Sequence, residues 1–387
     1  MGYSIKGEEN SSPFLFGGLM AKRVLFTGHG GFVGHHCLEY FLDNTDWELI
    51  CIDSFRHKGT VRRVQETLES VRCDEKFAHH FIGENPRVKN YVHDLTVPID
   101  HQLENLIFER SIDDRGAITE KPIHYIINMA SDSAVERSTS DPTACLNNNW
   151  HLSINMLEFA RRCKKLELFL QISTDEVYGE APPAPDAHKE WAPILPSNPY
   201  AASKAAQEAM AISYWRTYNL PIVITNTMNI IGERQDSEKF LPKIIQKIAQ
   251  NEEMPIYGDS EDSIGTRIYL HARNMASAIV FLSKKPITRY LDLVREGTTG
   301  DTRPDRYNVC GDDEVSNLEL AKMVAKVMDR ELKYHLVSSE SARPGYDRRY
   351  ALDGSKIADM GWKAPITLQE SLDQIVSWTL ENPHWII

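Results

Sequence analysis

The chain has 387 residues, with 43 Lys and Arg against 55 Asp and Glu, and therefore a formal net charge of −12. Its 42% apolar and 25% charged residues are typical of a globular protein and exclude collagen-like, low-complexity and wholly disordered classes. No apolar run approaches the roughly 20 residues that span a bilayer, so we expect no integral membrane protein. The acidic balance disfavours a general nucleic-acid binder. It still allows an anionic small ligand held by a few local Arg and Lys.

The cysteines and the N-terminal segment indicate a reducing, cytoplasmic setting. Residues 1–19 are polar and Gly/Ser-rich and contain no apolar segment of signal-peptide length, so we expect a tail outside the fold. No two cysteines have CxxC spacing, which disfavours a zinc ribbon or a redox dithiol. The six are Cys37, Cys51, Cys73, Cys145, Cys163 and Cys310.

From residue 22 onward, short apolar runs alternate with helical patterns. Continuous apolar strands alternating with helices predict a parallel sheet covered on both faces, an α/β Rossmann-type doubly wound fold. The helical patterns include 143–163 and 199–218. The apolar runs lie at 24–26, 47–55, 123–131, 166–179 and 219–232.

The chain divides into two predicted domains. Residues 20–231 form a dinucleotide-binding domain, in which the charged, weakly periodic segments 55–90 and 111–121 are predicted insertions. After about residue 232 the pattern changes to helical and turn segments. We therefore expect a smaller mixed α/β substrate domain over 232–387, with segments that can interleave with the first domain.

The turn TGHGGFVG places Gly28, Gly31 and Gly34 in GxxGxxG spacing, with Phe32 and Val33 between the last two. Glycine is required where the backbone turns tightly, where it approaches a pyrophosphate, and where a helix packs closely on a strand. The pyrophosphate then lies over the free N–H groups at the start of the helix. The turn predicts a dinucleotide site.

Asp53 ends the next strand, 19 residues after the last glycine of the turn. A carboxylate at this place hydrogen-bonds the adenosine ribose and repels a 2′-phosphate, which favours NAD over NADP. The cationic residues Arg56, His57 and Lys58 follow closely and keep NADP open as the alternative.

Two elements carry candidate catalytic groups. One apolar run ends in Thr174, Asp175 and Glu176, at the strand end where ligands bind in open α/β sheets. Tyr200 and Lys204 lie four residues apart on one helix face. A Lys ammonium near a phenol stabilises the phenolate and is expected to lower the pKa of Tyr200, making it a usable base.

With these motifs the sequence resembles the extended short-chain dehydrogenase/reductase family, and most closely the NDP-glucose 4,6-dehydratases of the dTDP-glucose type. The resemblance runs from about Lys22 to the C-terminus. It is carried, in order, by TGHGGFVG, NMASDSAVERS, ISTDEVYGE, PSNPYAASK, EKFLP, MPIYGD and RPGYDRRYALD. Epimerases of the wider family usually lack the Asp-Glu pair of STDEVYG, and decarboxylases typically have Ser in place of this Asp.

The resemblance implies a mechanism and a role for each catalytic residue. Tyr200, helped by Lys204, takes the proton of the sugar 4-hydroxyl while C4 passes a hydride to NAD. Glu176 removes the C5 proton, Asp175 protonates the departing 6-hydroxyl, and Thr174 hydrogen-bonds the 4-oxygen. The product is a 4-keto-6-deoxy sugar. Two carboxyl groups in opposite protonation states are the physical requirement of such a cycle.

Further positions are implied by the resemblance alone. Cofactor contacts are expected at Asp94, Leu95, Met129, Ala130, Ser131 and Asn148, besides the glycine turn, Tyr200 and Lys204. Nucleotide-sugar contacts are expected at Ser133, Asn229, Lys239, Phe240, Pro255, Tyr257, Arg267, Asn308 and Arg343. A guanidinium fork suits a phosphate, which favours Arg267, although a surface salt bridge is an equal alternative for a single Arg.

The chain departs from the family pattern near the substrate. Ile230 and Ile231 stand where the family has Asn and Tyr, Asn148 replaces Thr, Asn274 replaces Asp, and Tyr346 replaces His. The catalytic set is intact, so these changes leave the nucleotide base and the sugar open. An epimerase or decarboxylase acting on a nucleotide sugar, and a non-catalytic NAD-binding protein, are the alternatives.

Metal binding is disfavoured, because no Cys or carboxylate completes a ligand set around His79, His80, His93 and His101. The helices at 143–163 and 199–218 match those that form a dimer interface in the family. A homodimer is therefore expected, although burial within one subunit gives the same pattern. The apolar residues concerned are Leu146, Ile154, Leu157, Ala205, Ala209 and Ile212.

Overall fold

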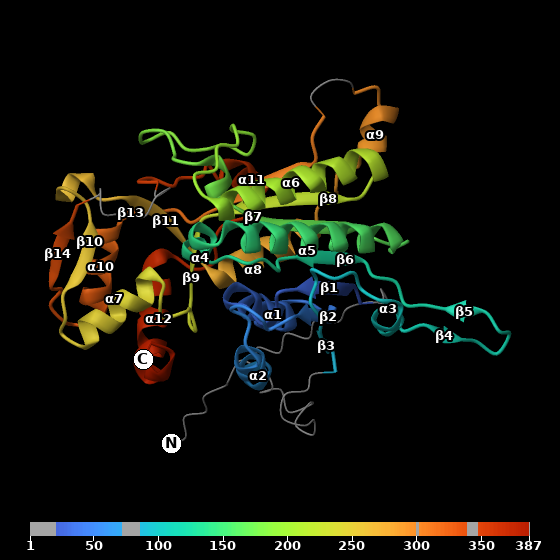
Figure 1. Cartoon of the computed structure of the whole chain (residues 1–387), viewed down its shortest axis with the longest axis horizontal. Helices are drawn as coiled ribbons and strands as arrows, with labels where there is room; N and C mark the ends of the chain where they lie inside the picture. The colour runs from blue at the N-terminus through green and yellow to red at the C-terminus, as the bar shows by residue number, and fades with distance from the viewer. Residues whose placement is uncertain (1–20, 72–85, 299–301, 339–346, 387) are drawn as a thin grey trace, which may run out of the picture.

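The structure is a computed structural model that describes residues 21–71, 86–298, 302–338 and 347–386 (Figure 1). Within these ranges no helix is long and apolar enough to cross a membrane. Several positions named above lie outside the described residues, namely the segment 1–19, Cys73, His79, His80, Arg343 and Tyr346.

A seven-stranded parallel sheet forms the centre of the molecule, and it confirms the predicted Rossmann-type α/β fold. Its order is β12-β8-β7-β6-β1-β2-β3, so the order of the strands reverses between β1 and β6. Such a switch point is where open α/β sheets bind ligands. The strands are β1 (Arg23–Thr27), β2 (Glu48–Asp53), β3 (Val88–Val92), β6 (Tyr125–Asn128), β7 (Leu168–Thr174), β8 (Ile222–Thr227) and β12 (Asp305–Val309).

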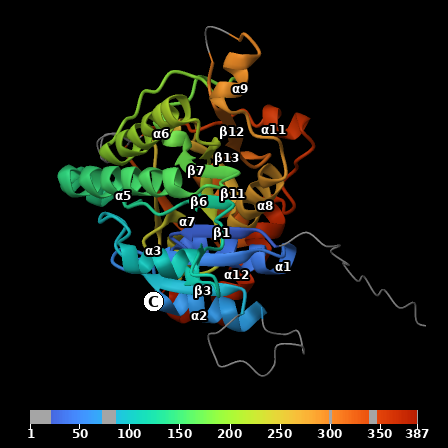
Figure 2. The same cartoon turned by 90° about the vertical axis from the view of Figure 1, so that its right-hand side faces the viewer.

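Helices cover both faces of this sheet, and strand residues point alternately to the two cores. In β1, Val24 and Phe26 face one core and Leu25 the other, all fully buried. Figure 2 shows α5 and α6 on one side of the strands, with α1 and α8 on the other. The first core includes α1 (Phe32–Asn44), α2 (Val61–Ser70), α8 (Ala272–Ser283) and α11 (Ser355–Asp359). The second includes α3 (His101–Phe108), α5 (Pro142–Arg162) and α6 (Pro199–Tyr218).

A smaller unit lies at one end of the molecule and a hairpin projects at the other (Figure 1). The unit has its own core around α7 (Phe240–Ala249), α10 (Asn317–Val327) and α12 (Leu368–Glu381). Its short strands are β9 (Asn229–Ile231), β11 (Thr266–His271) and β13 (Glu314–Ser316) in one sheet, and β10 (Met254–Tyr257) and β14 (Tyr334–Val337) in another. The hairpin pairs β4 (Ser111–Ile112) with β5 (Ile118–Thr119). Short helices are α4 (Val135–Ser140), α9 (Tyr290–Arg295) and the 3₁₀ turns Asp175–Tyr178, Glu261–Ser263 and Pro383–Trp385.

The interpretation of 55–90 as one insertion is wrong in part. Residues 61–70 form α2, the regular crossover helix between β2 and β3, and Thr60 caps it by accepting a hydrogen bond from the Arg63 N–H. Its apolar contribution to the core is only Val64 and Leu68, beside the buried polar residues Arg63 and Thr67. That narrow stripe among charges explains why the periodicity is weak. Residues 72–85 lie outside the described ranges.

Elements beyond residue 232 complete the large sheet and its first core. Strand β12 pairs with β8 at the edge of the large sheet, and α8 packs against α1 in the first core. The two halves of the chain therefore interleave. The division at 231/232 stays a proposal about sequence organisation.

The core packing leads to a stability prediction. Leu38 on α1 is fully buried, so we expect Leu38→Ala to lower the free energy of unfolding by about 2–5 kcal/mol through lost burial and a residual cavity. Leu106 on α3 is 55% exposed, and Leu106→Ala should change it by less than about 0.5 kcal/mol. Urea unfolding followed by circular dichroism measures both, and equal effects would contradict the assignment of Leu38 to the core.

Candidate active site

A cavity of about 360 Å³ opens at the carboxyl edge of the sheet, where the strand order reverses. All of the predicted cofactor and catalytic residues meet in its wall, although they come from seven separate stretches of chain. They are Gly28, Gly31, Phe32, Val33, Gly34, Asp53, Asp94, Leu95, Met129, Ala130, Ser131, Asn148, Thr174, Asp175, Glu176, Tyr200 and Lys204. Of the predicted substrate contacts, Ser133, Asn229 and Lys239 also line it.

The glycine turn fits a pyrophosphate because the backbone leaves no room for side chains. Gly28 has φ +78°, and a Cβ there would lie 2.9 Å from the Ala130 backbone. A Cβ on Gly34 would lie 2.0 Å from the Gly28 carbonyl oxygen. The first turn of α1 can therefore pack directly on the end of β1, and Phe32, Val33 and Gly34 of this turn line the cavity, where the N–H groups of a helix start can bind a phosphate.

The predicted ribose end of the cavity is preorganised by hydrogen bonds. Asp53 Oδ2 accepts from the Gly30 N–H at 3.0 Å, and Oδ1 accepts from the Phe55 N–H at 2.8 Å. Arg56 Nη1 lies 2.6 Å from Asp94 Oδ2, and Arg56 Nη2 donates to Asn148 Oδ1 at 2.9 Å. The charge of Arg56 is thus compensated by Asp94, which suits NAD better than a cofactor with an additional phosphate.

The two carboxyl groups after β7 have different surroundings. Thr174 Oγ1 donates to Asp175 Oδ1 at 2.9 Å, whereas Asp175 Oδ2 is buried without a hydrogen-bond partner among the described residues. Burial, with a further contribution from the Glu176 carboxylate, raises the pKa of Asp175 to about 7. Glu176 Oε2 instead accepts from Asn198 Nδ2 at 2.8 Å. Near neutral pH, Asp175 can therefore hold a proton beside an acceptor carboxylate.

Tyr200 and Lys204 both line the cavity, but the predicted lowering of the Tyr200 pKa is wrong for this structure. Burial raises the pKa of Tyr200, and the Glu176 and Asp175 carboxylates raise it further. Lys204 Nζ donates to the Ile172 carbonyl oxygen at 2.6 Å and to Gln207 Oε1 at 2.7 Å. Desolvation and the neighbouring carboxylates therefore raise the pKa of Tyr200 by more than the Lys204 ammonium lowers it.

The segment that follows β9 also contributes to the cavity wall, and sequence reasoning missed two of its residues. Gln235 and Asp236 line the cavity beside Lys239. The rule that ligands bind beyond strand ends also applies to β9, which precedes this segment. Thr227 and Met228, which line the cavity at the end of β8, could have been found by the same rule.

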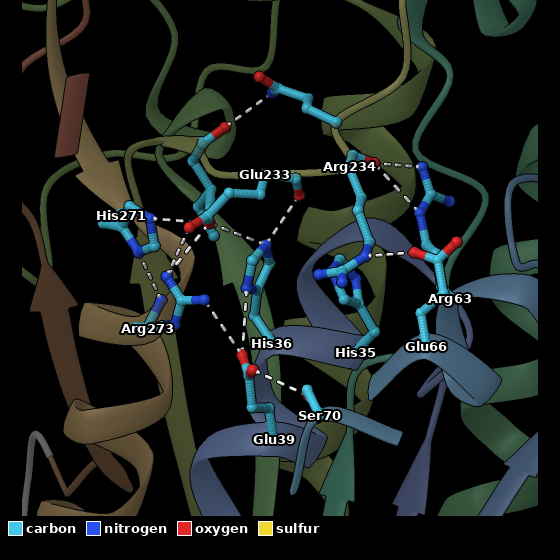
Figure 3. Close-up of polar contacts among 12 residues, drawn as sticks. His35, His36, Glu39, Arg63, Glu66, Ser70, Glu233, Arg234, His271 and Arg273 are labelled. Atoms are coloured by element: carbon cyan, nitrogen blue, oxygen red, sulfur yellow. Dashed lines mark hydrogen bonds and ion pairs between the residues drawn. The ribbon is translucent and has the colours of Figure 1, made fainter. Parts of the chain in front are cut away.

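A partly buried ion pair and hydrogen bonds to backbone carbonyl oxygens hold this segment in place (Figure 3). Glu233 Oε1 lies 2.8 Å from Arg273 Nη1 of α8, and the Glu233 carbonyl oxygen lies 2.9 Å from His36 Nε2 of α1. Arg63 Nη2 of α2 donates to the Arg234 carbonyl oxygen at 2.7 Å. Three helices of the first core therefore fix the segment that carries Gln235 and Asp236.

The described residues contain no group of three or more His, Cys, Asp or Glu arranged to hold a metal ion. Two neighbouring histidines of α1 are buried. Burial lowers the pKa of His36 to about 3 and places that of His35 well below its usual value. Both imidazoles are therefore neutral at physiological pH.

Other predicted substrate residues lie outside the cavity wall. Phe240, Pro255, Tyr257, Arg267 and Asn308 do not line it. Arg267 is 5% exposed and donates to the backbone carbonyl oxygens of residues 266, 347 and 348. Asn308 is fully buried. These contacts stay predictions, and Arg343 lies outside the described residues.

The predicted dimer face needs one correction. Leu157 is fully buried within the second core of the subunit, so it is unavailable to a partner. Leu146 is 38% exposed, and Trp150, one turn further along α5, is 46% exposed. Ala209 is exposed, and Ile154, Ala205 and Ile212 are partly buried.

Comparison with known proteins places these features in context. Residues 24–289 match the NAD dependent epimerase/dehydratase family. Over 359 residues the chain is 30% identical to the low-salt glycan biosynthesis protein Agl12 of Haloferax volcanii, covering 92% of this chain and 98% of the relative. It is also 30% identical to the dTDP-glucose 4,6-dehydratase of Haemophilus influenzae, covering 93% and 98%.

Solved structures agree in fold. DesIV, a dTDP-glucose 4,6-dehydratase from Streptomyces venezuelae with NAD and TYD bound, is 26% identical with a TM-score of 0.73, covering 94% of this chain and 98% of that one. The UDP-glucuronic acid 4-epimerase of Bacillus cereus has a TM-score of 0.73 at 20% identity, covering 93% and 99%. The same fold therefore serves more than one reaction.

The glycine turn gives a binding prediction. In Gly34→Ala the new methyl group would meet the Gly28 carbonyl oxygen at 2.0 Å and push α1 away from β1. We expect NAD affinity, measured by titration calorimetry, to fall more than about tenfold, or about 1.4 kcal/mol. Gly116→Asn is the control, because Gly116 has φ +76° and open space around it, and Asn tolerates that conformation. Unchanged affinity in Gly34→Ala would remove the turn from the cofactor site.

Proposed function

We propose that this chain, which belongs to the NAD dependent epimerase/dehydratase family, dehydrates a nucleotide-diphosphate hexose to its 4-keto-6-deoxy form. The family and its NAD cofactor agree with the prediction from the sequence. The finer activity rests on one observation, the Asp175–Glu176 pair at the end of β7. Among the described residues, Asp175 has a buried second oxygen without a hydrogen-bond partner, whereas Glu176 accepts a hydrogen bond from Asn198.

Elimination of water needs an acid and a base at adjacent carbons, and this pair can supply both. A carboxyl group with a pKa of about 7 can donate a proton, while a carboxylate beside an amide donor can accept one. An epimerase that only oxidises and reduces C4 has no use for such a pair. This contrast favours the dehydratase within the family.

Each of the chain's catalytic residues has a role in the proposed reaction. When bound, NAD accepts a hydride from C4 and returns it to C6. Tyr200 takes the proton of the 4-hydroxyl as a phenolate, a form that burial and the two carboxylates disfavour and that the Lys204 ammonium, one helical turn away, and the positive charge of the nicotinamide ring of bound NAD would favour. Thr174 hydrogen-bonds the 4-oxygen. Glu176 takes the C5 proton that the 4-ketone acidifies, and returns it to C5 when the hydride is added to C6. Asp175 gives its proton to the 6-hydroxyl, which leaves as water.

The substrate contacts follow the same proposal. Ser133, Asn229 and Lys239 already line the cavity. The resemblance adds Phe240, Pro255, Tyr257, Arg267, Asn308 and Arg343 as contacts of the nucleotide diphosphate. We also propose a homodimer through α5 and α6, whose exposed apolar residues include Leu146 and Trp150.

Product analysis tests the reaction. The protein, incubated with NAD and a panel of NDP-hexoses, should form a product with the alkali-induced absorbance of a 4-keto sugar. In Glu176→Gln we expect oxidation at C4 and accumulation of bound NADH absorbance, without elimination. The exposed Glu180 gives the matched control, Glu180→Gln, which should turn over normally. An epimer or a pentose without ketone, or normal turnover by Glu176→Gln, would overturn the assignment.

The pKa of Asp175 predicts a pH dependence. As the proton donor it must be protonated, so kcat should fall as pH rises through about 7, where this raised pKa lies. Asp175→Asn cannot donate and should lose about 10²–10⁴ in kcat, together with that descending limb. Initial rates from about pH 6 to about pH 9 test this. A wild-type profile without a descending limb near pH 7 would argue against Asp175 as the acid.

A further inference from the structure

A buried ion pair lies directly behind the catalytic residues, and the proposed reaction does not use it. Glu208 on α6 and Arg306 on β12 are both 0% exposed, and Arg306 Nη2 donates to Glu208 Oε2 at 2.5 Å. Arg306 also donates to the Glu190 carbonyl oxygen at 2.9 Å and lies over the Trp191 ring. Desolvating two charges is costly, so such a pair is weak evidence for stability and raises the question of what else it does.

The second oxygen of Glu208 connects the pair to the end of the catalytic strand. Asn226 on β8 donates from Nδ2 to Glu208 Oε1 at 2.8 Å and to the Thr174 carbonyl oxygen at 3.0 Å. Asn226 is itself fully buried. The orientation of the carboxylate therefore fixes the amide that holds the backbone of Thr174, immediately before Asp175 and Glu176.

The same carboxylate acts on Lys204. The two residues lie four apart on α6 and face the same side of the helix. Lys204 is 3% exposed, and its ammonium donates to two neutral acceptors, the Ile172 carbonyl oxygen and the Gln207 amide oxygen. Burial lowers the pKa of Lys204 to about 8, and the Glu208 carboxylate opposes this shift.

The other charged and titratable groups near α6 affect the pKa values of the tyrosines rather than that of Lys204. Glu176 and Asp175, from the turn after β7, raise the pKa of Tyr200, as do Cys145 and Asp132 from the elements packed against α6. Burial raises the pKa of Tyr178, and Arg306, from β12, opposes that rise. Glu208 is therefore the buried countercharge of Lys204.

We propose that Glu208 is a positioning residue of this site: held by Arg306, it keeps the Lys204 ammonium charged and, through Asn226, fixes the Thr174 end of β7. Its role in turnover rests on the proposed function, because Lys204 and Thr174 serve the proposed oxidation at C4. Its effect on Lys204 is a property of the folded chain and can be measured without turnover.

The test follows Lys204 directly by NMR in the NAD-loaded full-length protein labelled with ¹³Cε-lysine, with the resonance assigned by its loss in Lys204→Met. In Glu208→Gln we expect the titration midpoint of Lys204 to fall by about one to three pH units, because an opposite charge is removed. Glu208→Asp keeps the charge and should restore the midpoint. Glu109→Gln is the control, since Glu109 pairs with Arg23 at the start of β1, away from the active-site edge.

A second variant distinguishes a loss of folding from a change in the titration of Lys204. If Glu208→Gln leaves Arg306 unpaired and does not fold, Glu208→Gln/Arg306→Gln removes both charges and is titrated instead. A wild-type midpoint for Lys204 in a folded Glu208 variant overturns the proposal, even if the wild-type protein forms the ketone. Conversely, a lowered midpoint in a protein that forms no ketone supports the role of Glu208 and rejects the proposed reaction.

Discussion

The burial of the central sheet on both faces is the constraint on which the rest of the structure depends. Strands covered on both faces have no exposed surface, so polar groups can meet a ligand only where the strands end. Asp53 and Thr174 end β2 and β7, and Met129 directly follows β6. The glycine turn lets α1 start directly above β1 at this edge. One short edge of the sheet therefore collects residues from distant parts of the chain.

The same burial sets the electrostatics of the site. Removal from water disfavours every charged form, so the pKa values of Asp175 and Tyr200 rise and that of Lys204 falls. An acid that is still protonated near pH 7 follows directly from this. A charged Lys204 does not follow, and it requires a nearby anion such as Glu208. Burial thus provides the proposed acid and at the same time creates the need for a positioning pair.

Local patterns predicted the parts of the site that local geometry determines. The glycine spacing, Asp53 at the end of a strand, and Tyr200 and Lys204 one helical turn apart are each visible within a few residues. The helix α2 was missed because two buried polar residues, Arg63 and Thr67, interrupt its apolar stripe. The segment containing Gln235 and Asp236 reaches the cavity through ion pairs with residues far away in sequence, which no local pattern reveals. The raised pKa of Tyr200 likewise depends on tertiary packing.

The interleaving of the two halves of the chain gives the later half a role beyond substrate recognition. Arg306 comes from β12, the last strand of the sheet. Arg273 comes from α8, which packs against α1, the helix that follows the glycine turn. Arg306 binds the Glu208 carboxylate, which is linked to Thr174 through Asn226, and Arg273 binds the Glu233 carboxylate, next to the segment that carries Gln235 and Asp236. Because an unpaired buried charge is far costlier than a paired one, the buried carboxylates of Glu208 and Glu233 each strongly favour the arrangement in which their arginine is in place. The geometry of the cavity is therefore established only when residues beyond 232 have packed onto the sheet that the first half begins.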